Sequence, residues 1–319
     1  MSAVDPSSAG PASNVQSELF NQFARAYLEQ ARRERRWRWF WRLVWLGVAG
    51  AFIWAALENA PAAKAPSAPH TALIEVQGEI AADTEASADN IMAALRSAFE
   101  DDGAQAIVMR INSPGGSPVQ AGLVNDEVRR LKALHKKKVY AVCEEMCASA
   151  AYYIAVSADQ IYVDKASVVG SIGVLMDGFG FVGIMDKLGI ERRLMTSGDN
   201  KGMLDPYSPR NPQQDAYAQA MLDQIHDQFI KVVREGRGKR LKEAPDTFSG
   251  LFWNGEQAVS LGLADHLGSL DQVARDVVKA EDIIDYTQKE NLAERLAKRF
   301  GAAMGAGAVR AMRATFSVH

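Results

Sequence analysis

The sequence predicts an α/β domain built on a parallel sheet, preceded by a helix that spans a membrane. From residue 70 to about residue 176, short apolar segments of strand length alternate with helical patterns. Such alternation is typical of parallel strands joined by crossover helices. A separate apolar run near the N-terminus is long enough to cross a bilayer. The chain has 319 residues, 48% of them apolar and 24% charged, which suffices for one or two domains.

The N-terminal apolar run covers residues 39–57 and is interrupted only by Arg42. As a helix it would be about 28 Å long, enough to span the hydrocarbon core. Glu58 opens its C-terminal side, whereas its N-terminal side carries Arg32, Arg33, Arg35, Arg36 and Arg38. The positive-inside rule then places the N-terminus in the cytoplasm. We expect a single-pass anchor at residues 38–58.

Two alternatives to an anchor remain open. Residues 60–62 (APA) resemble a signal-peptidase site, but the roughly 38 residues before the apolar run are too many for an ordinary signal peptide. A buried helix of a soluble domain is the other alternative, and the arginines crowded at one end argue against it. With the anchor, everything after residue 60 lies outside the cytoplasm, in the periplasm of a Gram-negative cell.

Composition divides the chain into five parts. Residues 1–37 are a cytoplasmic and partly disordered segment, with a helix expected at residues 20–36, and residues 38–58 are the anchor. A linker rich in Pro and Ala at residues 59–69 would hold the next domain off the membrane. Residues 70–285 are the folded domain. Residues 286–319 form a basic tail rich in Ala and Gly, expected to be flexible or to lie on anionic lipid.

The folded domain is expected to contain strands at residues 73–76, 106–111, 139–142, 160–163 and 171–176. Helices are expected at residues 86–99 and 118–133, directly after Ser149, and at residues 212–237, 255–261 and 270–279. The 212–237 helix carries an apolar residue at every third or fourth position, which indicates an amphipathic stripe. Functional loops should lie at the carboxyl ends of the parallel strands.

Charge and cysteine content exclude several classes of function. A net charge of −3, without a basic patch among aromatic residues, excludes a general attraction to nucleic acid. Cys143 and Cys147 have no nearby histidines, so the sequence predicts neither a zinc site nor a cofactor. Their spacing fixes no geometry, and we interpret them as small buried thiols, although an oxidising compartment would permit pairing.

The candidate chemistry begins with Ser149 and Lys201, which have no histidine between them. A serine hydroxyl needs a base to become a nucleophile, and an amine acts as one only when a water-shielded site keeps it neutral. Ser171 is the candidate hydroxyl that orients this amine. Alone, Ser149 could be a helix N-cap and Lys201 a solvated loop cation.

A glycine turn supplies the candidate oxyanion hole. Glycine allows the backbone to approach a ligand closely, so Gly115 or Gly116 could offer one N–H group. The amide of Ala150 lies at a helix start and could offer the second. Two such donors aimed at one oxygen predict acyl transfer. Taken alone, the glycine turn could instead bind a phosphate or coenzyme A.

The order and spacing of these motifs resemble the signal peptide peptidase A family, also called protease IV. The resemblance covers residues 70–285 and rests on residues 113–117 (SPGGS), 148–155 (ASAAYYIA), 170–174 (GSIGV), 197–201 (SGDNK), 229–237 and 253–265. It implies a ClpP/crotonase-like fold of stacked ββα units. It also implies a serine endopeptidase of the bacterial inner membrane that degrades signal-peptide remnants and other hydrophobic or unfolded peptides.

By the same resemblance, Ser149 is the nucleophile, Lys201 the general base and Ser171 the residue that orients the lysine. The family also implies a homo-oligomer, a ring or dome, in which the dyad is completed between protomers. One departure is Ala150-Ala151, where the family often has Gly-Gly, which would narrow the pocket. The competing functions are a catalytically silent membrane-tethered scaffold and a crotonase-like thioester enzyme.

Overall fold

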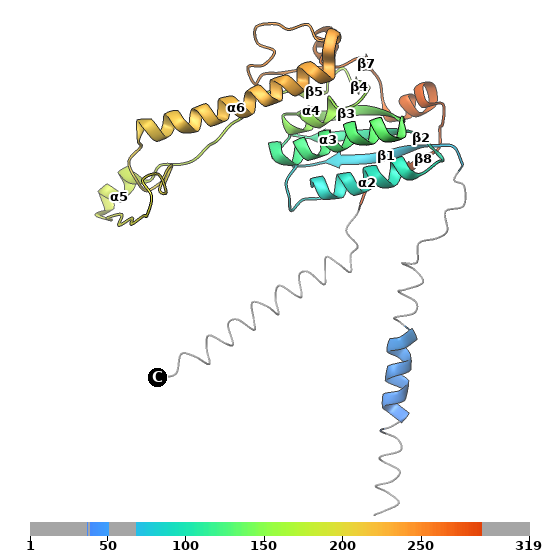
Figure 1. The fold of residues 1–319 in the computed structure, drawn as a ribbon, viewed down its shortest axis with the longest axis horizontal. Coiled ribbons are helices and arrows are strands. Elements are labelled where there is room, and N and C mark those ends of the chain that lie inside the picture. Colours follow the sequence, from blue (N-terminus) through green and yellow to red (C-terminus); the bar gives the residue numbers. More distant parts are fainter. Residues whose placement is uncertain (1–36, 38, 51–67, 289–319) are drawn as a thin grey trace, which may run out of the picture. The chain divides into compact units, whose positions relative to one another are not determined.

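The computed structural model describes residue 37, residues 39–50 and residues 68–288 (Figure 1). Its contacts divide the chain into two units, Met1–Ala65 and Pro66–His319. In the first unit, residues 39–50 are helical, and the Trp37 ring stacks on Phe40 with ring centroids 5.7 Å apart. No helix among the described residues combines the length and the hydropathy needed to cross a bilayer. Residue 38 and residues 51–58 of the expected anchor lie outside the described residues.

The second unit is built on one eight-stranded sheet with the order β6-β5-β3-β2-β1-β8, in which β4 pairs with β3 and β7. The strands are β1 (His70–Gln77), β2 (Ala104–Ser113), β3 (Lys138–Ala148), β4 (Gln160–Val163), β5 (Val168–Gly170), β6 (Phe252–Trp253), β7 (His266–Leu267) and β8 (Ile283–Asp285). Every strand pair is parallel except β5 with β6. The expected parallel sheet is therefore confirmed, with one antiparallel strand at its edge.

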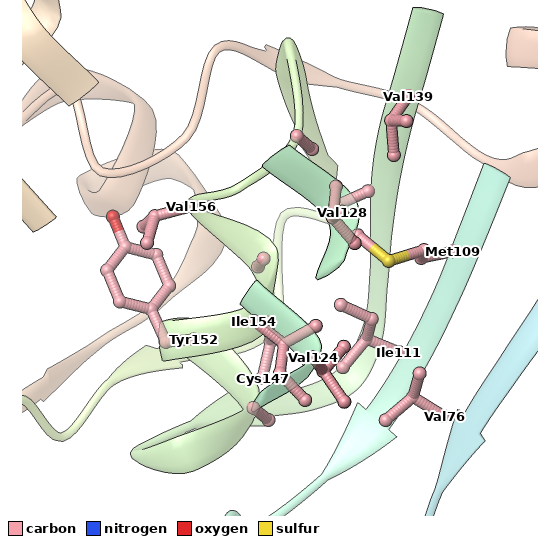
Figure 2. Packing of buried hydrophobic residues seen from close by; sticks show 14 of the residues in the cluster. Val76, Met109, Ile111, Val124, Val128, Val139, Cys147, Tyr152, Ile154 and Val156 are labelled. Carbon is pink, nitrogen blue, oxygen red and sulfur yellow. The ribbon is translucent and has the colours of Figure 1, made fainter. Parts of the chain in front are cut away.

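Helices α2 (Ala88–Glu100), α3 (Pro118–His135) and α4 (Ala150–Ala155) lie against the sheet (Figure 1). Figure 2 shows Val124 and Val128 of α3 and Ile154 of α4 packed near Met109 and Ile111 of β2, all within one buried cluster. A smaller cluster packs Val108, Val142, Tyr162 and Val273 together with α8 (Leu270–Gln272) and the π-helical η2 (Val273–Val278). The sheet thus buries apolar side chains in two separate clusters.

The long helices begin where the local sequence offers caps. Ser117 caps α3 by accepting a hydrogen bond from the amide of Gln120, and Pro118 follows at the first helical position. Helix α6 (Pro212–Arg237) begins in the same way, with Asn211 as cap, and ends before Gly238. Along the chain, η1 (Gly238–Arg240) follows α6, and α7 (Gly255–Ser260) lies between β6 and β7.

Residues 173–211, here called the 173–211 segment, connect β5 to α6 and contain α5 (Val182–Leu188) and Lys201. None of its residues is buried. Figure 1 shows α5 and the first turns of α6 away from the sheet, within the second unit. Helix α6 is anchored by its later turns, where Phe229, Val233 and Arg237 are buried.

Most expected elements of the folded domain are observed with their ends shifted by a few residues. The strand expected at residues 171–176 is wrong: β5 covers Val168–Gly170, and the backbone leaves the extended conformation at Ser171, whose φ is 50°. The helix expected at residues 270–279 is divided into α8 and η2. The helix expected at residues 20–36, most of the 59–69 linker and the tail after residue 288 lie outside the described residues.

Candidate active site

The predicted site residues follow three neighbouring strands at the points where these strands end. Strand β2 ends at Ser113, directly before the glycine turn, and β3 ends at Ala148, directly before Ser149. Strand β5 ends at Gly170, directly before Ser171. Ala148 pairs with Gly170, and Ser113 pairs with Cys147. The carboxyl ends of the three strands therefore lie side by side, at the end of the sheet where these strands terminate. The glycine turn, Ser149 and Ser171 thus follow the carboxyl ends of strands, where open α/β sheets bind their ligands.

A bulge in β3 sets the register of this edge. Cys143 pairs with Ile111 and Cys147 pairs with Ser113, so β3 advances four residues where β2 advances two. Asn112 supports the bulge by accepting a hydrogen bond at Oδ1 from the amide of Met146, 3.2 Å away. Bulges bend a strand and redirect the residues that follow it. Here the redirected residue is Ser149.

Ser167 supports the same bulge from the loop between β4 and β5. It is buried, and its hydroxyl bonds to the carbonyl oxygens of Cys143 and Glu144. The sequence patterns assigned no role to Asn112 or Ser167. For Asn112 the available signal is its position three residues before Gly115. No signal in the sequence points to Ser167, because its hydrogen bonds to β3 arise only when the strands pair.

Ser149 occupies the turn between β3 and α4. It is half-buried, with φ 55° and ψ −124°, a conformation that residues other than glycine rarely adopt. Its amide donates to the carbonyl oxygen of Gly170 at 2.8 Å, and its own carbonyl accepts from the amide of Tyr153 at 3.0 Å. Strained backbone of this kind is concentrated at functional sites and persists where its surroundings hold it.

The glycine turn lies directly against Ser149. A Cβ on Gly115, whose φ is 106°, would lie 2.7 Å from the Ser149 Cβ and 3.0 Å from the Ala150 amide nitrogen. A Cβ on Gly116, whose φ is 144°, would lie 2.2 Å from the carbonyl oxygen of Ile80. Both positions therefore require glycine, for conformation and for space.

The amides around Ser149 differ in their hydrogen bonds. The Gly115 amide donates to Ser113 Oγ at 3.1 Å, so it is already engaged. In the part of the chain that the structure describes, no hydrogen bond is found from the amides of Gly116 or Ala150. Of the two glycines proposed from the sequence, Gly116 is therefore the one whose amide makes no hydrogen bond among the described residues.

Ser171 lies beside Ser149 because both directly follow the paired residues Ala148 and Gly170. Its backbone also has a positive φ, 50°, and its amide donates to the carbonyl oxygen of Leu251 at 2.7 Å. The Trp253 ring of β6 packs against Gly170, where a Cβ would lie 2.7 Å from ring carbon Cε3. The turn at Ser171 is thus held by the antiparallel edge strand and the residues that precede it.

Lys201 lies elsewhere on the surface. It is exposed in a turn of the 173–211 segment, where its amide donates to the Gly198 carbonyl oxygen at 3.1 Å. No interaction between Lys201 and Ser149 is found among the described residues. Within one chain, the structure brings together Ser149, Ser171 and the glycine turn and leaves Lys201 apart. The Ser/Lys dyad remains a prediction.

The 173–211 segment, which carries Lys201, has large exposed apolar side chains and borders a hollow. Leu175, Phe179 and Met195 are 82%, 80% and 94% exposed. A hollow of about 760 Å³ is lined by residues 176–180, by residues between 194 and 211, and by the first turns of α6.

The core behind α4 packs against the turn at Ser149 from the other side. Tyr152 is fully buried and its hydroxyl donates to the Leu263 carbonyl oxygen at 2.7 Å, while burial raises the pKa of this phenol.

Cys143 and Cys147 are buried free thiols, as interpreted from the sequence, and burial raises the pKa of Cys147. The described residues contain no group of three or more His, Cys, Asp or Glu placed to hold a metal ion.

Known families and proteins match much of this chain. A sequence model of peptidase family S49 matches residues 132–283, and one of the Clp proteases matches residues 69–167. A putative protease of Synechocystis sp. is 31% identical over 198 residues, which are 62% of this chain and 69% of that protein. The Clp match and the mixed α/β sheet together fit a ClpP/crotonase-like fold.

Other relatives are longer than the matched region. A putative signal peptide peptidase of Enterococcus faecium is 27% identical over 198 residues, which are 62% of this chain and 57% of that protein. A protein of Brucella melitensis named as a Na(+)/H(+) antiporter is 46% identical over 176 residues, which are 55% of this chain and 24% of that protein. The chain therefore spans about a quarter to three fifths of these two relatives.

Proposed function

Because the chain belongs to peptidase family S49, we propose that it is a membrane-anchored serine endopeptidase that uses Ser149 as nucleophile and Lys201 as general base. The observation that carries this proposal is the position of Ser149. It lies on a strained turn at the end of β3, directly against Gly115. The nearby amides of Gly116 and Ala150 make no hydrogen bond among the described residues.

The proposed reaction is acyl transfer. The Lys201 amine takes the Ser149 proton while Oγ attacks the scissile carbonyl carbon, and the amides of Gly116 and Ala150 donate to the oxyanion that forms. Lys201 then gives the proton to the leaving amine, and a water molecule hydrolyses the acyl-enzyme. By analogy with measured oxyanion holes, each amide contributes about 3 kcal/mol to the transition state. Ser171 orients the lysine amine.

The proposed enzyme is a homo-oligomer, a ring or dome, in which Lys201 of one protomer serves Ser149 of another. The exposure of Lys201 and the apolar surface of the 173–211 segment support this arrangement. A second copy that covers this surface would remove water from the lysine, which favours its neutral form. An isolated protomer would then lack the base.

We further propose that residues 38–58 anchor the enzyme in the bacterial inner membrane with the N-terminus in the cytoplasm. The 70–285 domain would then act in the periplasm or outside the cell, on signal-peptide remnants and other hydrophobic or unfolded peptides. The name of the Enterococcus faecium relative supports this class of substrate. The antiporter name supports no transport function for this chain, because the match covers 24% of that protein.

The test uses the full chain in detergent micelles or lipid nanodiscs. A panel of signal peptides and one unfolded protein is incubated with wild type, Ser149→Ala and Lys201→Ala, and the products are identified by mass spectrometry. We expect each substitution to lower cleavage about 1,000-fold or more. Lys187→Ala, which removes another exposed lysine of the 173–211 segment, serves as the matched control and should keep its activity. Full activity of Ser149→Ala or Lys201→Ala would refute the dyad.

Mixing the two inactive variants tests the oligomer. If the dyad forms between protomers, co-expression of Ser149→Ala with Lys201→Ala creates some interfaces that contain both an intact serine and an intact lysine. Part of the activity should return. No recovery in a verified mixed oligomer would place both residues of the dyad in one chain. Turnover of acyl-coenzyme A thioesters without peptide cleavage would favour the thioester enzyme, and no turnover of either would favour the silent scaffold.

A further inference from the structure

His226 contacts the backbone directly after Ser171. It is half-buried on α6, and its Nε2 lies 3.0 Å from the carbonyl oxygen of Ile172. A carbonyl oxygen only accepts hydrogen bonds, so Nε2 carries a proton and donates it. Both the neutral ring protonated at Nε2 and the imidazolium can form this bond. The contact therefore does not require His226 to gain or lose a proton.

This hydrogen bond completes a clamp around Ser171. On one side, the Ser171 amide donates to the Leu251 carbonyl oxygen at 2.7 Å. On the other side, the Ile172 carbonyl accepts from His226, and the Ile172 side chain is fully buried. Between these two points the backbone has a φ of 50°, which a serine rarely adopts unless its surroundings impose it.

The clamp also marks the point where the 173–211 segment leaves the core. Ile172 is buried, and none of the following residues through Asn211 is. His226 itself is held in place because Phe229, one turn later on α6, and Val233 are buried in the core. The position of Ile172 relative to α6 therefore fixes where the segment that carries Lys201 begins.

We propose that His226 is a positioning residue for the Ser/Lys reaction. Its Nε2–H group holds the Ile172 carbonyl, and through it sets the direction of the Ser171 hydroxyl and the path of the 173–211 segment. His226 does not touch the substrate and transfers no proton. This inference rests on the proposed function, because the orientation of Ser171 matters only if Ser171 orients the catalytic lysine.

The test compares His226→Leu with His226→Gln in the full chain. Leucine fills space but cannot donate, whereas the side-chain amide of glutamine can donate to the same carbonyl oxygen. Gln224→Leu, an exposed position on the same helix, is the matched control. Kinetics of peptide cleavage and hydrogen exchange of backbone amides in residues 168–176 are measured for all variants, with melting temperatures to verify folding.

We expect His226→Leu to lower kcat about 10- to 100-fold, because small displacements of catalytic groups have effects of this size. KM should change by less than about twofold, since the residue contacts no substrate. Exchange in residues 168–176 should accelerate. His226→Gln should restore both properties and leave the pH profile of kcat unchanged, and Gln224→Leu should resemble wild type.

Wild-type kinetics and exchange in His226→Leu would overturn the inference, as would equal losses in the leucine and glutamine variants. A pH profile altered in His226→Gln would indicate proton transfer instead of positioning. Absence of Ser149-dependent cleavage in wild type would refute the proposed function itself. Exchange would then still decide whether the clamp exists. If His226→Leu does not fold, hydrogen exchange of residues 168–176 in His226→Gln is the deciding measurement. Faster exchange in that variant than in wild type would overturn the inference.

Discussion

The amide of Ser149 donates a hydrogen bond to the carbonyl oxygen of Gly170 across a distance of 2.8 Å. This bond continues the pairing of β3 with β5 past the last residue of β3. It places Ser149 and Ser171, which are far apart in the sequence, next to each other at the same sheet edge. The geometry of the candidate site therefore depends on the register of two short parallel strands.

The space at Gly115 gives the first prediction. Gly115→Ala should lower peptide cleavage at least about 100-fold, because its Cβ would lie 2.7 Å from the Ser149 Cβ and its φ of 106° disfavours alanine. The matched control is Gly122→Ala, inside α3, where a Cβ meets nothing within 4 Å. This control should keep its activity and gain about 1 kcal/mol in free energy of unfolding. Steady-state kinetics measures peptide cleavage, and urea unfolding measures the free energy of unfolding. Normal activity of Gly115→Ala would contradict the described turn.

The second prediction concerns the buried ion pair of Arg237. Its fully buried guanidinium donates to both oxygens of the Asp265 carboxylate at 2.8 Å, and to the Gly262 carbonyl oxygen. Arg237→Met should lower the free energy of unfolding by about 3 to 5 kcal/mol, because it removes the buried partner of that carboxylate.

Arg234→Met is the control for Arg237→Met. Arg234 pairs with Glu243 on the surface, so its loss should cost less than about 1 kcal/mol. Urea unfolding of both variants makes the comparison. Similar losses in the two variants would show that the burial of Arg237 does not decide its contribution.

The third prediction is a pH dependence of stability. A hydrogen bond from Arg130, together with Arg96, lowers the pKa of Glu127 from 4.5 to about 2. A folded-state pKa below the unfolded value stabilises the protein above pH 4.5, and this contribution is lost as the pH falls toward 2. Glu127→Gln should therefore be less stable than wild type by about 1 to 3 kcal/mol at pH 7.

The difference between wild type and Glu127→Gln should become smaller between pH 5 and pH 3. Urea unfolding of both proteins at pH 7, 5 and 3 measures it. A deficit that stays constant across this range would mean that Glu127 contributes through packing and not through its charge.

Local sequence patterns predicted much of the fold. The helices expected at residues 118–133 and 212–237 begin where α3 and α6 begin, at a proline that a capping side chain precedes. The alternation of strands and helices predicted a parallel sheet, and a short helix was expected directly after Ser149, where α4 begins. These features depend on residues close in sequence, which is why the sequence alone could reveal them.

The end of β5 could not be predicted in this way. Residues 171–176 have the composition of a strand, but the Leu251 carbonyl takes the Ser171 amide and the Trp253 ring packs on Gly170. Both partners come from about 80 positions later in the chain. Tertiary contacts therefore overrode the local preference, and the strand ended before Ser171.

By itself, the sequence determined the order of the first four strands and of the helices between them, the candidate nucleophile and the glycine turn beside it, because periodicity and turn chemistry act over a few residues. It did not predict α5 or the short strands β6, β7 and β8. Only the tertiary structure decided that the Gly115 amide is engaged, that the Gly116 amide makes no hydrogen bond within the described part of the chain, and that Lys201 lies apart from Ser149 within one chain. The positions of these groups depend on the strand register, on the bulge in β3 and on the path of the 173–211 segment. They arise from packing between parts of the chain that no local pattern connects.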